Sequence, residues 1–426
     1  MKQTIMKKMK WLPAMLIAGV CTFTACSDDE AKGDVFSELT EEQHKENIEK
    51  EGIAMVQEME DLANLATYDV IDAFMGFMDQ SEQKQLAVLQ VSLNEIQALK
   101  NGPKSTANPK ALMMEKKRLS DEFKSETGIY EWDAEALDWK LLEESETEAT
   151  FRFLVDGQDA EISVYNVSVK DAANQDEASE MIMELPLTIN AHVKLGGQII
   201  TSFALTAEWH NDDLPKNVKE VITLEAFSFT SELTNTSTKL SASAAFKHNN
   251  TNIYSNGFEL KGEFDYSAIM NTLPENEGDL SSLYSQTVLE NANIWFQIGN
   301  IKVEGLFDFE GFMEGMADKM KELGEGATEA DFDNALVELV NEYAVLYVRY
   351  ADTGEIIAKG EFYFAEYEED GYTYEEPALR MVFGDGSKVS VDDFFNNGFG
   401  DMIEEVKDML DELEAAYGGS SDVQTK

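Results

Sequence analysis

A strict alternation of apolar and polar residues between Met181 and Trp209 constrains the fold more than any other feature. Every odd position from 181 to 195 is apolar, and the even positions from 184 hold Glu, Pro, Thr, Asn, His and Lys. The apolar odd positions then resume after Gly196-Gly197, at Ile199, Phe203, Leu205, Ala207 and Trp209. Successive side chains of a strand point to opposite faces, so this pattern predicts two long, half-buried strands joined as a hairpin.

Parity then predicts the length of the hairpin loop. A two-residue loop would pair odd with even positions and place the two apolar faces on opposite sides. We therefore expect a three-residue loop, Gly196-Gly197-Gln198, with a glycine bulge, which pairs Ala191 with Phe203 and Ile189 with Leu205. Leu195 would pair with Ile199. Pro186 lies on the polar face and lacks a backbone donor, which indicates an edge or a bulge at that position.

The remaining periodicity alternates between helix and strand. Thr40 and Gln43 stand at the spacing of a helix-capping box, and apolar residues then recur at helical spacing. A change of phase near Glu225 indicates a bulge in a strand over 219–230, and Asp352-Thr353-Gly354 is typical of a hairpin turn. The predicted segments are a helical region 40–128, an antiparallel β region 129–310, a helical insertion 311–344, a β-meander 345–392, a C-terminal helix 393–417 and a tail 418–426.

This order predicts an α+β fold with an extended, curved antiparallel β-sheet, closed at most into a half-barrel. A strand over 181–195 would be about 50 Å long at 3.3 Å per residue, so the sheet must twist and curve. Such a sheet could form a concave apolar trough, or its apolar face could be covered by the helices of 40–125 and 399–417. A trough would resemble bacterial lipoprotein carriers at the level of the fold only.

The N-terminus has the organisation of a secretion signal. Basic residues from Lys7 precede an apolar run over 11–23, which is too short to span a bilayer, and small residues lead to Cys26. This stretch resembles a bacterial lipobox, which implies that residues 1–25 are removed and that Cys26 is acylated. The acidic stretch that follows, formed by Ser27, Asp28, Asp29 and Glu30, resembles the surface-export signal of Bacteroidota lipoproteins. The resemblance implies a lipidated tether over 26–39 and an outward-facing position on the outer membrane.

Charge and cysteine content limit the partners. The net charge is −50, and removal of the four signal lysines would lower it to −54. Such a surface repels phosphate backbones, so nucleic acid is an unfavourable partner. The two cysteines are Cys21, which leaves with the signal, and Cys26, so the mature chain can form no disulfide.

Chemistry-bearing motifs are scarce. The four histidines do not stand at metal-ligand spacing, and the sequence has no nucleophile elbow, Walker loop or dinucleotide fingerprint, so we predict no catalytic residue, metal or cofactor. Trp132 and Trp139 lie in an acidic segment and are candidate ligand contacts. Three more candidates, Tyr367, Tyr372 and Tyr374, lie in the acidic run 366–376, which otherwise predicts a solvated hairpin tip.

Three functions remain open from the sequence. The first, which the missing catalytic motifs favour, is a non-enzymatic binding or accessory protein at the cell surface, with a glycan as one possible ligand. The second is a carrier of a lipid or other apolar ligand in the trough. The third is a hydrolase, which would require two carboxylates at a set separation in a cleft.

Overall fold

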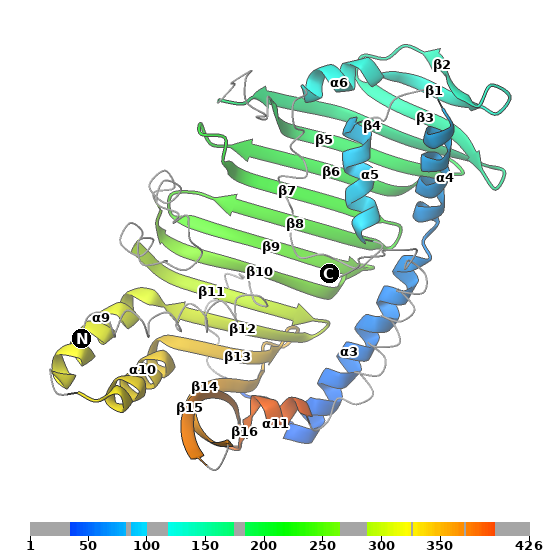
Figure 1. The fold of residues 1–426 in the computed structure, drawn as a ribbon. Helices are drawn as coiled ribbons and strands as arrows, with labels where there is room; N and C mark the ends of the chain where they lie inside the picture. The colour runs from blue at the N-terminus through cyan, green and yellow to red at the C-terminus, as the bar shows by residue number, and fades with distance from the viewer. Residues whose placement is uncertain are drawn as a thin grey trace. The chain divides into compact units, whose positions relative to one another are not determined.

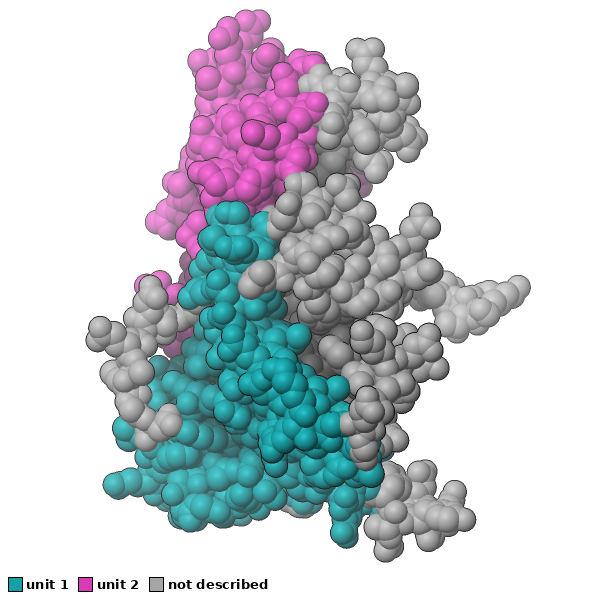
Figure 2. All heavy atoms as spheres, turned by 90° about the vertical axis from the view of Figure 1, so that its left-hand side faces the viewer, with its two compact units in different colours: residues 1–55, 236–243, 254–411 teal, residues 56–235, 244–253, 412–426 magenta. Residues whose placement is uncertain are grey.

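The computed structural model describes residues 35–81, 87–99, 118–173, 184–264, 288–324, 327–369 and 372–396. The chain forms two compact units, shown in Figure 2. Unit 1 contains residues 1–55, 236–243 and 254–411, and unit 2 contains residues 56–235, 244–253 and 412–426.

The predicted α+β class with an extended antiparallel sheet is confirmed (Figure 1). The sheet is curved and open, and its strands follow one another almost in chain order from β16 at one edge to β1 and β2 at the other. One neighbouring pair is parallel, because β3 returns beside β1 after the β1–β2 hairpin. The strands of the N-terminal half are β1 (Gly128–Asp133), β2 (Asp138–Glu143), β3 (Glu148–Val155), β4 (Gln158–Asp171), β5 (Glu184–Leu195), β6 (Gln198–Trp209), β7 (Pro215–Leu224) and β8 (Phe227–Asn235). The remaining strands are β9 (Lys239–His248), β10 (Thr251–Glu263), β11 (Val288–Ile298), β12 (Ile301–Asp308), β13 (Ala344–Tyr350), β14 (Ile356–Glu369), β15 (Tyr372–Phe383) and β16 (Lys388–Ser390).

The helices lie in the segments that the periodicity indicated. They are α3 (Glu41–Ala63), α4 (Ala66–Gln80), α5 (Ala87–Leu99), α6 (Leu119–Glu126), α9 (Phe309–Leu323), α10 (Glu329–Tyr343) and α11 (Val391–Asn396). The capping box before α3 is confirmed, since the Thr40 N–H donates to Gln43 Oε1 at 2.9 Å and the Gln43 N–H donates to Thr40 Oγ1 at 3.4 Å. Most of the predicted C-terminal helix lies outside the described residues.

In unit 2, α4 packs its apolar stripe on one face of the sheet. The Phe74 ring lies 5.5 Å from Phe151 and 5.9 Å from Phe153. The central odd positions of the β5–β6 hairpin lie on the same face and are almost fully buried: Ile189, Ala191, Val193, Phe203 and Leu205 are each at most 2% exposed. The apolar face of the predicted strand pair is therefore covered, as a core requires. The prediction is wrong at Ile199, which pairs with Lys194 instead of Leu195 and is 61% exposed.

The β5–β6 loop differs from the prediction. Leu195 pairs directly with Gln198, so the loop has two residues, Gly196 and Gly197, with φ of 57° and 79°. Two successive positive φ angles define a type I′ turn, whose twist suits a hairpin. A bulge between Val193 and Lys194 then shifts the register, so that Ala191 pairs with Phe203 and Ile189 with Leu205, as predicted.

The predicted bulge at Glu225 is wrong. Glu225, with φ of 53°, begins a two-residue turn, and Leu224 pairs with Phe227 across it. The segment 219–230 is thus two antiparallel strands and not one bulged strand. A turn and a bulge both reverse the phase of an alternating pattern, and Glu is an uncommon residue at positive φ, so the sequence did not reveal the turn.

In unit 1, the first residues of α3 pack against one face of the β-meander that begins with β13. His44 Nδ1 lies 2.9 Å from the Tyr350 hydroxyl, and Ile48 packs against a core that includes Met381, Phe383 and Phe394. Asp352-Thr353-Gly354 forms the β13–β14 turn, as predicted, with Gly354 N–H donating to the Tyr350 carbonyl at 2.8 Å. The end of the expected tether is also held, because Phe36 forms a parallel bridge with Ile356.

Candidate functional site

The exposed face of the sheet in unit 2 carries polar residues at positions that alternate with the helix-covered core. Cross-strand pairing aligns them in rows. One row is made almost entirely of small hydroxyl residues and runs Thr150, Ser163, His192, Ser202, Thr223, Ser228. Its neighbours hydrogen-bond to each other, with Thr150 Oγ1 2.8 Å from Ser163 Oγ and Ser202 Oγ 2.6 Å from Thr223 Oγ1.

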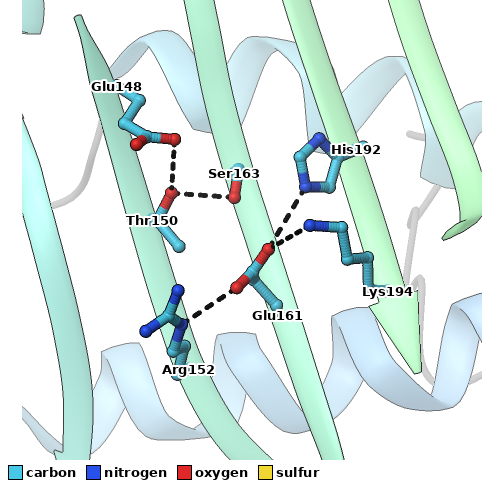
Figure 3. A network of polar contacts seen from close by, with 7 residues as sticks. All are labelled: Glu148, Thr150, Arg152, Glu161, Ser163, His192 and Lys194. Atoms are coloured by element: carbon cyan, nitrogen blue, oxygen red, sulfur yellow. Dashed lines mark hydrogen bonds and ion pairs between the residues drawn. The ribbon is translucent and has the colours of Figure 1, made fainter. Parts of the chain in front are cut away.

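A charged cluster lies beside this row and is centred on Glu161 of β4 (Figure 3). Arg152 Nε donates to Glu161 Oε2 at 2.9 Å, and Lys194 Nζ donates to Glu161 Oε1 at 2.6 Å. His192 Nε2 lies 3.4 Å from the same oxygen. The cluster combines residues from three adjacent strands, because Arg152 pairs with Glu161 and Glu161 pairs with Lys194.

The environment fixes the charge state of each member. Burial by itself would raise the pKa of Glu161, but hydrogen bonds from Lys194, Arg152 and His192 outweigh it and lower the pKa to about 2. Burial lowers the pKa of His192 below 6.5, and the contact with Glu161 offsets this only in part. At neutral pH the carboxylate is therefore ionised and the imidazole is neutral.

Ser163, His192 and Glu161 are the residue types of a hydrolytic triad, but their arrangement is different. In a triad the histidine accepts the hydroxyl proton of the nucleophile. Ser163 is 1% exposed, and its hydroxyl bonds to Thr150, whereas the contact of His192 Nε2 is with Glu161. The carboxylate is held by two cations besides, so this cluster has neither an accessible nucleophile nor a free base.

The strand β4 is irregular beside the cluster. Tyr165 pairs with Asn190, and the next pair is Ser168 with Thr188, so β4 carries one extra residue there. Asn166 adopts φ of 53° at this bulge. A second register shift lies between Thr188 and Pro186, so of the two alternatives predicted at the proline, an edge or a bulge, the structure has the bulge. Bulges of this kind often re-aim side chains next to binding sites.

The sequence-predicted lipidation and export residues, Cys26, Ser27, Asp28, Asp29 and Glu30, lie outside the described residues.

The two predicted tryptophans lie together, but not as free binding surfaces. Trp139 is 5% exposed and packs edge-on against Phe151, at 5.1 Å, so it is a core residue and not an accessible ligand contact. Trp132 pairs with Trp139 across the β1–β2 hairpin and stacks on Phe77 at 4.7 Å. The acidic neighbours suggested exposure, yet alternation along β2 turns Trp139 inward while Asp138 and Lys140 flank it.

The three predicted tyrosines lie in one hairpin of unit 1. Tyr367 of β14 pairs with Tyr374 of β15, and Tyr372 pairs with Glu369 at the end of the described part of this hairpin. Tyr367 is 39% exposed. The pairing brings the backbones of Tyr367 and Tyr374 together, as expected for a hairpin tip.

The residues that sequence reasoning missed are Glu161, with its partners, and the bulge residues Tyr165 and Asn166. The alternation of β4 is visible in the sequence, but Arg152, Glu161 and Lys194 come together only once the registers of three strands are known. The sequence signal available for this site was the polar residue at every second position of these strands, which indicates a solvent-facing side of the sheet but not which residues meet there.

A buried carboxyl group lies on the opposite, helix-covered face. Glu220 of β7 is 2% exposed, and its Oε1 has no hydrogen-bond partner in the described part of the chain. Burial and, to a lesser extent, the nearby carboxylate of Glu95 in α5 together raise the pKa of Glu220 to about 8. Perturbed carboxyl groups often mark catalytic sites, but substrate cannot reach one sealed inside a core.

Two further observations complete the description of the site. Within the described ranges, no group of three or more His, Cys, Asp or Glu side chains is placed to hold a metal ion. None of the helices that the structure describes combines the length and the hydrophobicity needed to cross a membrane.

Comparison with known proteins adds no relative: no protein-family model matches the chain, and no curated protein or solved structure matches it significantly.

Proposed function

We propose that this protein is a lipid-anchored outer-membrane protein that faces outward and acts as a non-enzymatic binding or accessory protein. The lipobox-like sequence ending at Cys26 and the acidic residues after it support the anchor and the orientation. The observation that carries the binding role is the exposed polar face of unit 2, where the charges around Glu161 are paired with one another. A surface of this kind offers hydrogen bonds but no reactive group.

The carboxyl groups with the most altered pKa values give little support to a hydrolase. Glycoside hydrolysis requires two accessible carboxyl groups, one of them able to act as an acid. Glu161 has a pKa of about 2, so it cannot donate a proton at neutral pH. Glu220 has a pKa of about 8 and could donate one, but it is buried beneath the helices.

A carrier of an apolar ligand is the alternative function, and it would need space on the apolar face of the long strands. The residues of β5 and β6 that would line the trough instead form a core. Each of them is at most 2% exposed: Ile189, Ala191, Val193, Phe203 and Leu205. The covered face therefore favours the binding role over the carrier role.

Replacement of Cys26 tests the anchor. We expect Cys26→Ala to abolish acylation, measured by mass spectrometry of the N-terminal peptide, and to release the protein from the membrane fraction. Cys21→Ala is the matched control, because it removes a cysteine from the segment expected to be cleaved. Unchanged acylation and membrane retention in Cys26→Ala would refute the proposal. Protease treatment of intact cells tests the orientation, and full protection of the wild-type protein would contradict an outward-facing position.

Native mass spectrometry of the detergent-purified full chain separates the binding role from the carrier role. We expect a mass equal to the acylated polypeptide alone. A further stoichiometric mass that dissociates on denaturation and fragments as a lipid would establish the carrier function instead.

A further inference from the structure

We propose that Tyr165, Asn166, Asn190 and His192 form a binding platform for neutral oligosaccharides on the exposed face of unit 2. This inference rests on the proposed binding function and names its ligand class. The four residues belong to the neighbouring strands β4 and β5, and Tyr165 pairs directly with Asn190.

Aromatic surface is available on this platform. Tyr165 is 36% exposed, and its ring lies 5.4 Å from the His192 ring, tilted by 58°. The apolar C–H face of a pyranose ring packs on such rings, which supply apolar area and keep a polar atom at the edge. Among the described residues on the polar face of β3, β4 and β5, Tyr165 is the one Phe, Tyr or Trp side chain.

The two asparagines supply a donor and an acceptor side by side. Asn166 Nδ2 donates to Asn190 Oδ1 at 2.7 Å, which leaves Asn166 Oδ1 as an acceptor and Asn190 Nδ2 as a donor for a ligand. Adjacent sugar hydroxyls each donate and accept, so a pair of neighbouring hydroxyls matches this arrangement.

The bulge fixes the geometry of the amide pair before any ligand binds. Asn166 is held at φ of 53°, and its carbonyl accepts from Thr188 Oγ1 at 2.7 Å. Ser168 Oγ lies 2.6 Å from the same hydroxyl. Groups fixed in this way lose little conformational entropy on binding, which favours affinity.

Charge selects a neutral ligand. Arg152 and Lys194 pair with Glu161, and the Glu148 carboxylate lies close enough to act on His192, so two positive and two negative formal charges balance. His192 is neutral because burial lowers its pKa. The chain as a whole carries a charge of −50, so an acidic polysaccharide is repelled at long range, and the platform offers no unpaired cation to compensate.

Binding can be measured by isothermal titration calorimetry on the detergent-purified full chain. The ligands are maltohexaose, cellohexaose, xylohexaose and mannohexaose, with hexagalacturonate as the acidic comparison. We expect at least one neutral hexasaccharide to bind and hexagalacturonate to bind at least tenfold more weakly. No binding of any neutral ligand at millimolar concentration, or tighter binding of hexagalacturonate, would overturn the inference.

Substitutions locate the site. Tyr165→Ala should weaken binding at least tenfold, and Tyr165→Phe should retain it, because the ring is kept and the hydroxyl is not needed for stacking. Leu306→Ala is the control, since Leu306 is 38% exposed, much like Tyr165, but lies in unit 1. Equal affinities for wild type and Tyr165→Ala, with both chains folded by circular dichroism, would rule out the platform.

The outcomes separate this inference from the proposed function. Binding with cleavage of the oligosaccharide, detected by chromatography of the products, would leave the platform in place and refute the non-enzymatic role. Absence of binding, with acylation at Cys26 intact, would refute the platform and leave the surface lipoprotein.

Discussion

Replacement of Glu220 by glutamine should stabilise the protein, and the gain should increase with pH. Burial and the Glu95 carboxylate raise the pKa of Glu220 from 4.5 to about 8 in the folded chain. A carboxyl group with a raised folded pKa destabilises the fold as pH rises above its unfolded pKa, and the penalty is complete once pH exceeds the folded pKa. Each pH unit in this interval costs about 1.4 kcal/mol.

The expected magnitudes follow from that interval. Glutamine does not ionise, so Glu220→Gln and the wild type should differ by a small, constant amount below pH 4.5. The difference in free energy of unfolding should reach about 3 kcal/mol at pH 6.5 and on the order of 5 kcal/mol above pH 8. Urea unfolding of both chains at several pH values between 5 and 9 measures the difference.

Two control variants make the result specific. Glu232→Gln, on the adjacent strand β8, removes an exposed glutamate that pairs with Lys219, and its effect should not increase with pH in this way. Glu95→Gln removes the neighbouring negative charge, so the stability of that variant should fall less steeply with pH than that of the wild type. A difference between Glu220→Gln and wild type that stays constant from pH 5 to pH 9 would refute the reasoning.

The remaining predictions concern stability elsewhere in the chain. Gly76→Ala in α4 should stabilise by up to about 1 kcal/mol, because no atom lies within 4 Å of the new Cβ. Gly257→Ala should destabilise the protein by about 1–3 kcal/mol, because the new Cβ would lie 2.6 Å from the Ala242 carbonyl oxygen. Thermal unfolding of the Gly76→Ala and Gly257→Ala variants measures both changes, and equal changes in stability would contradict the close packing around Gly257. Glu161→Gln should lower the free energy of unfolding by about 1–2 kcal/mol at pH 7, a modest amount because the cationic partners of Glu161 are partly exposed. The loss should be smaller at pH 3, because the stabilisation by the ionised carboxylate disappears as pH falls from 4.5 towards its pKa of about 2. Urea unfolding at both pH values measures this, and a loss at pH 3 as large as at pH 7 would argue against the ion pairs.

The fold was largely predictable because alternation fixes which face of a strand is buried. Ala191 pairs with Phe203 as parity requires. The loop length was not predictable, because a bulge at Val193 restores the same parity after a two-residue turn. The periodicity of a strand sequence shows which side chains share a face of the sheet. Different combinations of turn length and bulge position place the same side chains on that face, so periodicity alone does not determine the loop.

The candidate site was less predictable than the fold. Glu161 lies 9 residues from Arg152, 33 from Lys194 and 31 from His192 in the chain, so its cluster depends on the registers of two strand pairs. The sequence instead favoured tryptophans in an acidic segment, and Trp139 proved to be part of the core. Local composition is a weak guide to exposure when alternation within a strand decides it.

The two faces of the sheet in unit 2 impose opposite conditions on function. The helix-covered face fills its space with apolar side chains such as Phe74 and Phe151, so a ligand there would have to displace α4 and lose that packing. On the opposite face no described helix has to move, and the formal charges of Arg152 and Lys194 balance those of Glu161 and Glu148 in a chain that is otherwise strongly negative. Glu161 holds both Lys194 and Arg152 by hydrogen bonds, so neither cation is left unpaired on this face. A neutral, hydroxyl-rich ligand exchanges water hydrogen bonds for protein ones at little cost, so it is the partner that this face accommodates without disturbing its own ion pairs.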